Sequence, residues 1–350
     1  MIGLYFIIAF SSSILKIENP IINEFYNDSS EFISDEISPF CNGVEFSLYE
    51  VTAPNDIKNI KIHIFNKEKW FENMFDVSFD NQRIIDPKFK KNFSGEVQVI
   101  FNNGMNCLFP SELRISGDWD DHINPEYLIS SLDVSLEEGN ILGITNFKLF
   151  LPETRNFENE VVVSSLMKLS GFITPRTFFV NVDLDTVNNS SKNFRYIFQE
   201  KPSKEMIEYN GFREGPMFEV NESFRWDDIL NGVFRKNDSN PLMIAKLLNN
   251  NWANRTEANA EIAIQGLEMF NKAIFYSYNS EDQLNYNYIG EDQSIFYMFD
   301  AASLALLTEH AMTNHNRAFF FNKLENQFYP IYYDGNSNIV ELGHVRGRPD

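Results

Sequence analysis

The chain has 350 residues, of which 43% are hydrophobic and 15% aromatic, so it is long enough for two domains and too apolar to be disordered. Its formal net charge of −21 disfavours both nucleic-acid binding and docking on anionic lipid, because so acidic a protein is repelled by phosphate groups. We therefore expect no nucleic-acid partner.

Residues 1–20 have features of a signal peptide or a membrane anchor. An apolar run extends from Ile2 to Phe10 and is followed by serines, which suits the hydrophobic core of a signal peptide and is too short for a membrane span. A basic segment before the run and a clear cleavage site are both missing, so a truncated anchor or an ordinary strand also fits. We expect an exported or membrane-tethered protein that meets a membrane only through this segment. A cytoplasmic protein is left open.

The two cysteines, Cys41 and Cys107, do not have the spacing of metal ligands. They can form one disulfide if the protein is exported, or remain two buried thiols. The sequence does not decide between these alternatives.

Strand patterns begin after a polar, turn-rich lead-in. Residues 21–94 are expected to form a linker and an accessory β segment, in which NIKIHIF (59–65) alternates between apolar and other residues. The same alternation appears in GEVQVIF (95–101), and CLFPSELRIS (107–116) and the apolar stretch ILGITNFKLFL (141–151) also read as strands. These segments predict a β-rich region over residues 95–200.

The first clear helix follows the strand at 141–151. Asn156 can cap it, FENEVVVSSLMKLS (157–170) forms its body, and Gly171 stands where a glycine commonly ends a helix. From residue 201 to residue 350 helical patterns predominate, including DAASLALLTEHAM (300–312) with Asp300 as its cap. A β-rich part followed by an α-rich part predicts an α+β fold with two lobes.

Lys148 lies in the middle of the apolar strand. A lysine there is either a surface residue whose stem covers apolar neighbours, or a buried cation that meets a carboxylate or a phosphate. Glu160 leads the apolar stripe of the next helix, and a pair between Glu160 and Lys148 would hold an ammonium in place for phosphate oxygens, as in phosphotransferases. The plainer alternative is a glutamate favoured by the helix dipole and an unrelated surface lysine.

The last strands of the chain form a hairpin-like pair, with Asn316 before the first strand and Asp334 after the second. Both side chains are therefore expected at the same end of the hairpin, where their oxygens would suit Mg²⁺ or Mn²⁺. Lysine, glutamate, asparagine and aspartate follow one another in the order of a protein-kinase-like fold. A G-x-G-x-x-G loop and the HRD and DFG motifs are absent, which excludes an ordinary protein kinase.

Several segments of the chain resemble the CotH family, the atypical kinases related to spore coat protein H. The resemblance covers roughly residues 95–340 and is carried by FKLFLPETRNFENEVVVSSLMKLSGFITPRTFFVNV (147–182), RYIFQEKPSKEMIE (195–208), LRISGDWDDHI (113–123), HNRAFFFN (315–322) and FYPIYYDGN (328–336). It implies a two-lobed, protein-kinase-like fold, with a β-rich N-lobe at 95–200 and an α-rich C-lobe at 201–350. The short stretch after Asp334 suggests that the C-lobe is incomplete.

The resemblance also implies an activity and a set of residues. Members of the family bind ATP with a divalent metal and transfer its γ-phosphate to protein hydroxyls. By position, Lys148 would contact the nucleotide phosphates, Glu160 would hold that lysine, and Glu200 would lie in the hinge beside the adenine. Asn316 and Asp334 would hold the Mg²⁺ or Mn²⁺ ion.

One position departs from the kinase pattern. The aspartate that accepts the hydroxyl proton lies about five residues before the metal-binding asparagine, and here that position is Ala311. The nearest substitutes as catalytic base are Glu309 and His310. We expect an atypical kinase that acts on a protein substrate, such as a coat or envelope protein. The alternative is a nucleotide-binding pseudokinase, or a non-catalytic surface or envelope assembly protein.

Two other groups of residues have plainer readings. His122 could form a metal cluster with Asp118, Asp120 and Asp121, although a polar loop is the simpler interpretation. Arg213 and Glu214 are expected in a turn near the cleft, most simply as a structural ion pair. We assign no role to His315.

Overall fold

The computed structural model describes residues 41–42, 53–80, 82–185, 193–221, 223, 244–277, 284–313 and 316–340. The expected signal peptide or anchor at 1–20 lies outside these residues, as does His315. Within the described part of the chain, no helix is both long enough and apolar enough to cross a membrane.

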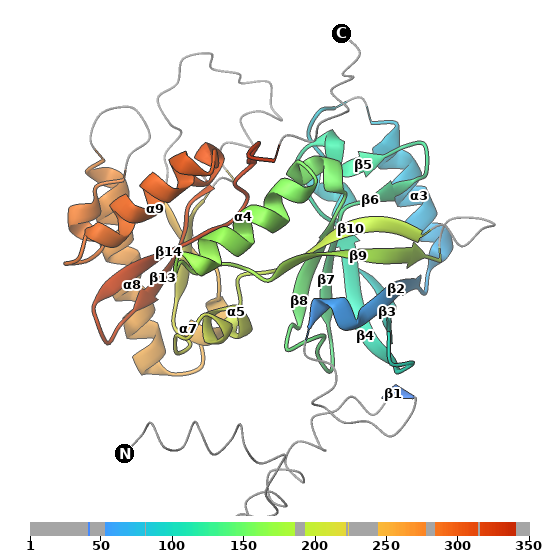
Figure 1. Ribbon diagram of the computed structural model, residues 1–350, viewed down its shortest axis with the longest axis horizontal. Helices are drawn as coiled ribbons and strands as arrows, with labels where there is room; N and C mark the ends of the chain where they lie inside the picture. Colours follow the sequence, from blue (N-terminus) through green and yellow to red (C-terminus); the bar gives the residue numbers. More distant parts are fainter. Residues whose placement is uncertain are drawn as a thin grey trace, which may run out of the picture.

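A closed barrel of seven strands forms the first half of the molecule (Figure 1). Around the barrel the order is β4-β3-β2-β9-β10-β8-β7, and β7 returns to pair with β4. Strands β2 and β9 run parallel, and the other neighbours are antiparallel. The bounds are β2 (Ile57–Ile64), β3 (Phe93–Phe101), β4 (Asn106–Ile115), β7 (Leu132–Leu136), β8 (Asn146–Phe150), β9 (Thr177–Leu184) and β10 (Asn193–Glu200).

The inward face of each strand fills the barrel with apolar side chains, as the alternating sequence pattern predicts. Three phenylalanines from neighbouring strands stack inside it, with ring centroids 4.2 Å apart for Phe147 and Phe198 and 4.6 Å apart for Phe178 and Phe198. Helix α3 (Lys67–Ser78) and the short pair β5 (Ile123–Asn124) and β6 (Ile129–Ser130) lie beside the barrel. Short 3₁₀ turns occupy Pro54–Asp56, Pro87–Phe89, Asp120–His122 and Pro152–Arg155.

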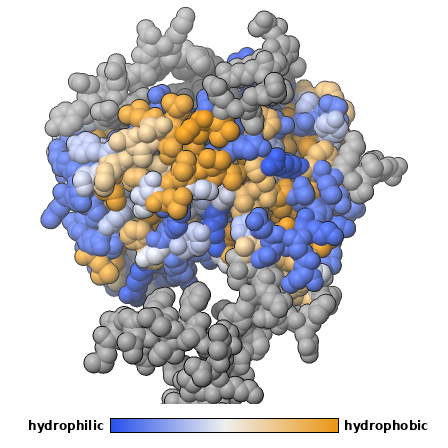
Figure 2. All heavy atoms as spheres, viewed as in Figure 1, coloured by the Kyte–Doolittle hydropathy of each residue, from blue (hydrophilic) through white to orange (hydrophobic). Residues whose placement is uncertain are grey.

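The second half is an antiparallel sheet of four strands with helices around it. The order is β12 (Ala245–Leu247), β11 (Met217–Val220), β13 (Ala318–Asn322) and β14 (Gln327–Ile331). The helices are α5 (Lys204–Tyr209), α7 (Asn250–Ala253), α8 (Glu257–Phe275) and α9 (Ser294–Ala305), and 3₁₀ turns occupy Tyr286–Tyr288 and Glu309–Met312. Helix α4 (Glu158–Leu169) connects the halves, because its Val163 and Met167 pack with Phe299 of α9 and with Tyr332 after β14. Figure 2, viewed as in Figure 1, shows hydrophobic residues gathered over α4 and α9.

The expected two-lobed, protein-kinase-like fold is wrong. The first half is rich in strands, as expected, but pairing of β4 with β7 closes them into a barrel, which is not a typical kinase lobe. The second half was expected to be mainly helical, but a four-stranded sheet lies at its centre. Alternation identified the strand segments, but closure depends on which strands become neighbours, and alternation does not encode that choice. The barrel takes β2 from the segment before residue 95.

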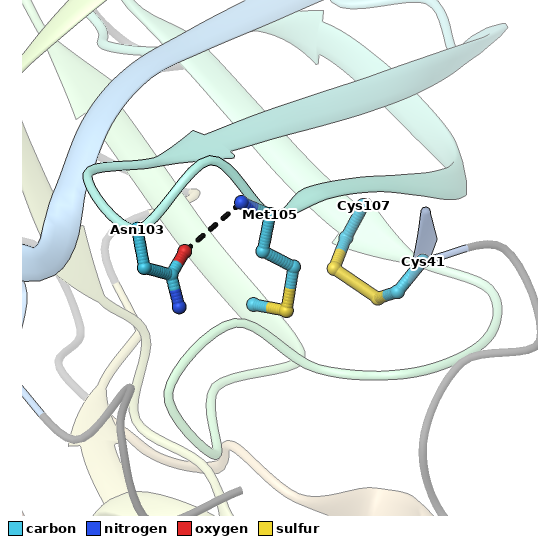
Figure 3. The surroundings of a disulfide bond; sticks show 4 residues. All are labelled: Cys41, Asn103, Met105 and Cys107. Carbon is cyan, nitrogen blue, oxygen red and sulfur yellow. Dashed lines mark hydrogen bonds between the residues drawn. A yellow bond between two sulfur atoms is a disulfide. The ribbon is translucent and has the colours of Figure 1, made fainter. Parts of the chain in front are cut away.

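A disulfide joins Cys41 and Cys107, which decides between the alternatives that the sequence left open (Figure 3). The two residues are direct partners in the pairing of β1 (Cys41–Asn42) with β4, and their Cα atoms are 4.0 Å apart. The bond therefore ties the first described residues to the barrel.

Two expected helix caps are also wrong. Helix α9 begins at Ser294, so Asp300 lies inside it, where it binds the Arg317 guanidinium at 2.8 Å and the Tyr286 hydroxyl at 2.5 Å. The side chain of Asn156 does not cap α4 and instead donates to Asn336. Tertiary partners take precedence over local capping at both positions.

Candidate functional site

A row of polar side chains crosses the outer face of the barrel. Cross-strand pairing places Arg114 beside Asp133, Asp133 beside Lys148, Lys148 beside Gln199, and Gln199 beside Thr177. Because their chain neighbours point into the barrel, these five side chains point outwards. The row faces α4 and the segment after β14, since Gln199 bonds to Glu160 and Lys148 bonds to Tyr333.

Lys148 is half-buried in this row. Its Nζ donates to the Tyr333 hydroxyl at 2.9 Å and lies 5.5 Å from the centres of the Phe150 and Tyr333 rings. Burial works against the charged ammonium, but Tyr333 and Asp133 outweigh it and raise the pKa of Lys148. The lysine is therefore a permanent cation at the junction of the two halves.

Glu160 does not form the expected ion pair with Lys148, since the structure has no contact within 4.0 Å between their charged atoms. Its carboxyl group is fully buried and accepts hydrogen bonds from Gln199 Nε2 at 2.9 Å and from the Tyr332 hydroxyl at 3.3 Å. Burial, and then the charge of Asp334, raise the pKa of Glu160 to about 7. Glu160 is thus held by neutral donors rather than by a cation.

Arg155 is the cation that the sequence analysis missed. Its side chain is 9% exposed, its guanidinium lies 4.0 Å from the centre of the Phe150 ring, and one terminal nitrogen is 3.2 Å from Asp334 Oδ2. Burial opposes its charge, but Asp334, Tyr333 and Glu160 raise its pKa. Its Nε is buried without a hydrogen-bond partner among the described residues. The signal in the sequence was the position of Arg155 in the segment LPETR, five residues beyond the end of the strand that carries Lys148.

Asn316 and Asp334 lie together at one end of the β13–β14 hairpin, as the sequence predicts. Asn316 Nδ2 donates to the backbone oxygen of Asp334 at 2.9 Å and to that of His310 at 3.4 Å. Asp334 is 20% exposed, and its Oδ2 faces Arg155. No described residue donates to Asn316 Oδ1 or to Asp334 Oδ1. One oxygen from each residue is therefore available for a ligand from outside the described chain.

Two turns with left-handed backbone place Arg155 and Asp334. Asn156 and Phe157 follow Arg155 with φ of 50° and 56°, and Asp334 and Asn336 have φ of 50° and 49°. The turns contact each other, since Asn156 Nδ2 donates to Asn336 Oδ1 at 2.8 Å. Such conformations cost about 1–3 kcal/mol each in residues other than glycine, and they are concentrated at functional sites.

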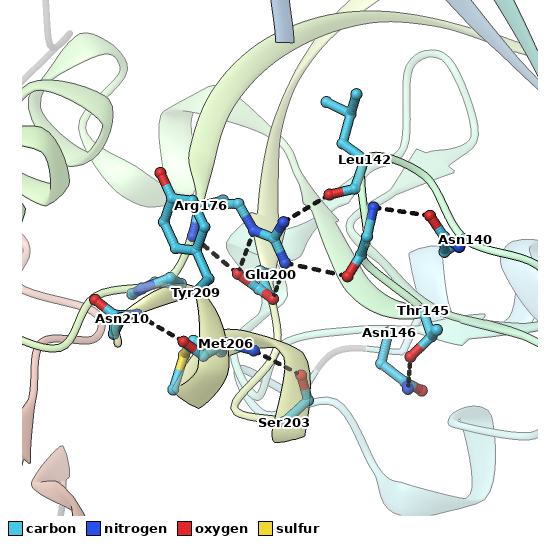
Figure 4. Close-up of polar contacts among 12 residues, drawn as sticks. Asn140, Leu142, Thr145, Asn146, Arg176, Glu200, Ser203, Met206, Tyr209 and Asn210 are labelled. Carbon is cyan, nitrogen blue, oxygen red and sulfur yellow. Dashed lines mark hydrogen bonds and ion pairs between the residues drawn. The ribbon is translucent and has the colours of Figure 1, made fainter. Parts of the chain in front are cut away.

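Glu200 lies at the junction but belongs to a different cluster (Figure 4). Its carboxylate accepts two hydrogen bonds from the Arg176 side chain, at 2.8 and 2.5 Å. Arg176 also donates to the backbone oxygens of Leu142 at 2.6 Å and Gly143 at 3.2 Å, and it lies 4.7 Å from the centre of the Tyr209 ring. No hydrogen bond or ion pair connects Glu200 directly with Lys148, Glu160, Asn316 or Asp334.

The two candidate bases lie in the 3₁₀ turn Glu309–Met312. Glu309 is exposed, and His310 is half-buried with its backbone oxygen bound to Asn316. Ala311, at the position of the usual aspartate, is buried in an apolar cluster with Met167 and Tyr332. The structure therefore brings His310 close to Asn316 through the backbone.

His122 and its neighbouring aspartates do not form a metal cluster. His122 is buried, its Nδ1 lies 2.9 Å from Ser131 Oγ, and burial lowers its pKa to about 2. Its ring fills the space that a side chain on Gly117 would need, and Gly117 has φ of +97°. Asp118 pairs with Lys90 at 2.6 Å. Across the described ranges, no group of three or more His, Cys, Asp or Glu side chains could hold a metal ion.

Arg213 and Glu214 do not pair with each other. Glu214 instead binds the guanidinium of Arg255 at 2.7 Å.

Most of the candidate residues therefore gather at the contact between the barrel and the second sheet. Comparison with known proteins adds no identification, because no family model and no curated protein matches the chain.

Proposed function

We propose that the chain is an ATP-dependent phosphotransferase of the CotH type that its sequence resembles, acting on a hydroxyl of a protein or an envelope component with Mg²⁺ or Mn²⁺. The observation that supports this most strongly is the meeting of two cations, the half-buried Lys148 and the buried Arg155, with the oxygen ligands of Asn316 and Asp334. Lys148 comes from β8 and Arg155 from the turn after it. Asn316 precedes β13 and Asp334 follows β14, so both lie at the open end of the hairpin.

The residues fit a phosphate group. Lys148 provides an ammonium and Arg155 provides a guanidinium whose Nε has no partner in the described chain. Charge-assisted hydrogen bonds from such donors to phosphate oxygens are about twice as strong as neutral ones. The aromatic side chains of Phe150 and Tyr333 beside them would restrict water around the bound phosphate.

The residues also fit one divalent ion. Asn316 Oδ1 and Asp334 Oδ1 can supply two oxygen ligands, and Mg²⁺ commonly takes one or two protein ligands with phosphate oxygens and water completing its shell. The ion would neutralise charge on the phosphates. Because Arg155 contacts the other carboxylate oxygen, Oδ2, Asp334 could bind the ion through Oδ1 and keep its contact with the guanidinium.

The proton of the acceptor hydroxyl would pass to His310 or Glu309. Phosphoryl transfer through a loose transition state depends more on positioning and charge than on a strong base. The closed Asn316–His310 contact would hold this turn next to the metal ligand.

A non-catalytic, nucleotide-binding or envelope assembly protein is the second candidate. The burial of Ala311 in an apolar cluster favours it, because no acidic group stands at that position. The Cys41–Cys107 disulfide supports export under either proposal, because such bonds persist in oxidising compartments. Alkylation of both cysteines in unreduced protein taken from cells would count against export.

The test compares the intact chain with Lys148→Met, Asp334→Asn and the control Lys272→Met, whose exposed side chain pairs with Glu268 on α8. We expect transfer of labelled γ-phosphate from ATP with Mn²⁺, and an increase in melting temperature, since ATP binds the folded chain. Both effects should disappear in Lys148→Met and Asp334→Asn and persist in Lys272→Met.

An increase in melting temperature with ATP and Mn²⁺, but no transfer of labelled phosphate, would favour the non-catalytic candidate. If the intact chain gained no label and was not stabilised by ATP, both the kinase and the nucleotide-binding protein would be excluded.

A further inference from the structure

Helix α3 exposes a row of three phenylalanines on the side away from the barrel. Phe71, Phe75 and Phe79 are 45%, 48% and 64% exposed, whereas Trp70 and Met74 of the same helix are buried. The spacing of four residues places the three rings on one face, and adjacent ring centroids are 6.4 and 4.6 Å apart. A contiguous exposed aromatic row in a soluble domain commonly marks an interaction surface.

A cavity of about 330 Å³ lies at the C-terminal end of the same helix. Ser78 and Asp80, the neighbours of Phe79 in the chain, both line it, so the aromatic row leads to its edge. Its polar lining includes the carboxylates of Asp80, Asp120 and Asp121, and its apolar wall includes Ile84, Ile85 and Phe89. The combination suits a ligand with a positive group on an apolar stem.

Two of the three carboxylates around the cavity have no ion-pair partner in the described part of the chain. Asp120 and Asp121 have no ion-pair partner within 4.0 Å among the described residues, and Asp80 lies 3.8 Å from the ammonium of Lys88. The pKa of Asp121 is raised, mainly by partial burial of its carboxylate. The positive charge of Arg155 opposes this shift, and the negative charges of Asp120 and Asp334 add to it. The C-terminal end of α3 adds the negative end of a helix dipole, so a cation would be attracted here.

We propose that the aromatic row and the acidic cavity together dock a basic, apolar segment of another protein. A lysine or arginine side chain of the partner enters the cavity, and its apolar side chains pack on Phe71, Phe75 and Phe79. Charge complementarity selects this occupant, because the carboxylates and the net charge of −21 would repel anionic lipid and nucleic acid. A free small amine would fill the cavity but would leave the aromatic row uncovered.

The surface is separate from Lys148, Asn316 and the other proposed ligand-binding residues, and the inference does not depend on phosphotransfer. Its cavity is nevertheless near them, since Asp121 is influenced by the charges of Arg155 and Asp334. A docked segment would therefore be held next to the candidate site, where it could be a substrate or a regulator.

The experiment measures binding of the intact chain to a capped synthetic peptide of repeating Lys-Leu-Leu units by titration calorimetry. Matched probes have Glu in place of every Lys, or Ser in place of every Leu. We expect binding of the first peptide only, weakened by added salt. Phe75→Ser and Asp121→Asn should each weaken it about tenfold or more, the range of an interface hot spot. Controls are Phe275→Ser and Glu137→Gln, which change an exposed aromatic and an exposed acid elsewhere.

Phe75 is 48% exposed and Asp121 is also exposed, so neither test variant changes the core, and a melting curve would establish that both variants fold. The proposal is overturned if the Lys-Leu-Leu peptide does not bind, or if the Glu peptide binds equally well. It is also overturned if the test variants bind as tightly as the controls. Co-sedimentation with neutral phosphatidylcholine vesicles that depends on Phe75 would identify a lipid surface instead.

Discussion

Two arginine–carboxylate pairs lie at the junction of the barrel and the second sheet, and they differ in how completely they are bonded. In the first pair, Arg176 donates twice to Glu200 and also to the backbone oxygens of Leu142 and Gly143. Glu200 is fully buried and receives a further bond from the backbone N–H of Arg176. The pair joins the start of β9 to the end of β10 and to the loop before β8.

In the second pair, Arg155 makes a single contact of 3.2 Å with Asp334 and one hydrogen bond of 3.0 Å to the backbone oxygen of Thr154, and its Nε has no partner among the described residues. Asp334 retains an oxygen without a described donor and is 20% exposed. A buried polar group without a partner costs about 1–3 kcal/mol, and a hydrogen bond from the Arg155 Nε to a ligand would remove that cost. We therefore expect the fully bonded pair Arg176–Glu200 (the closed pair) to stabilise the fold, and the pair Arg155–Asp334 (the open pair) to keep donors and acceptors available for binding.

The largest expected effect comes from breaking the closed pair. Arg176→Met leaves Glu200 as an uncompensated buried charge, which should lower the free energy of unfolding by about 3–5 kcal/mol. Urea unfolding monitored by tryptophan fluorescence measures this. Arg176→Lys should recover only part of the loss, because an ammonium cannot reproduce the two parallel bonds. A loss below about 1 kcal/mol in Arg176→Met would show that the closed pair is not structural.

The next prediction concerns the pH dependence of the free energy of unfolding, because the titrating carboxyl of Glu160 lies beside the open pair. Its pKa is about 7 in the folded chain against an ordinary value of 4.5, so folding favours the protonated carboxyl. The stability contributed by that proton is fully present below pH 4.5 and is lost as the pH rises through about 7. Glu160→Gln removes the titration and should be more stable than the intact chain by about 3 kcal/mol at pH 8, with the difference vanishing near pH 4.5.

The control for this experiment is already within the molecule. Burial lowers the pKa of His122 to about 2, so its contribution is lost as the pH falls below 6.5, the opposite direction. His122 is present in both proteins and should cancel in the difference between their unfolding curves. A difference that does not change with pH would show that Glu160 is ionised as usual in the folded chain.

The sequence predicted the parts of the fold that depend on local pattern. The alternation of residues 59–65 and 95–101 identified β2 and β3, and the hairpin at the end of the chain placed Asn316 with Asp334. The closed barrel was not predictable in this way. It requires β2 to pair in parallel with β9 and β4 to pair with β7, and such long-range choices depend on the packing of the whole chain.

The partners of the site residues were the least predictable part. The sequence suggested Glu160 as the partner of Lys148, but in the structure Lys148 donates to Tyr333, and Glu160 accepts from the neighbouring Tyr332. Both tyrosines come from the segment after β14, which is distant in the sequence. Arg155 stands in a short polar turn, where an arginine is commonly exposed. Its burial follows from the contact of that turn with residues near Asn336, which no local pattern encodes.

The smallest effect on stability should come from breaking the open pair, and it decides whether the comparison holds. Arg155→Met removes one ionic contact and one backbone hydrogen bond and leaves behind a carboxylate, Asp334, that is 20% exposed, so we expect a loss of about 1–2 kcal/mol in urea unfolding, smaller than that of Arg176→Met. The same change should abolish stabilisation by ATP with Mn²⁺, whereas Arg176→Met should retain it. Because Arg155 holds the pKa of Glu160 down, its removal should also move the pH-dependent loss of stability to higher pH. If Arg155→Met instead destabilised the chain as much as Arg176→Met and left the pH dependence unchanged, both pairs would be structural, and the unpartnered Nε would have to be explained without a ligand.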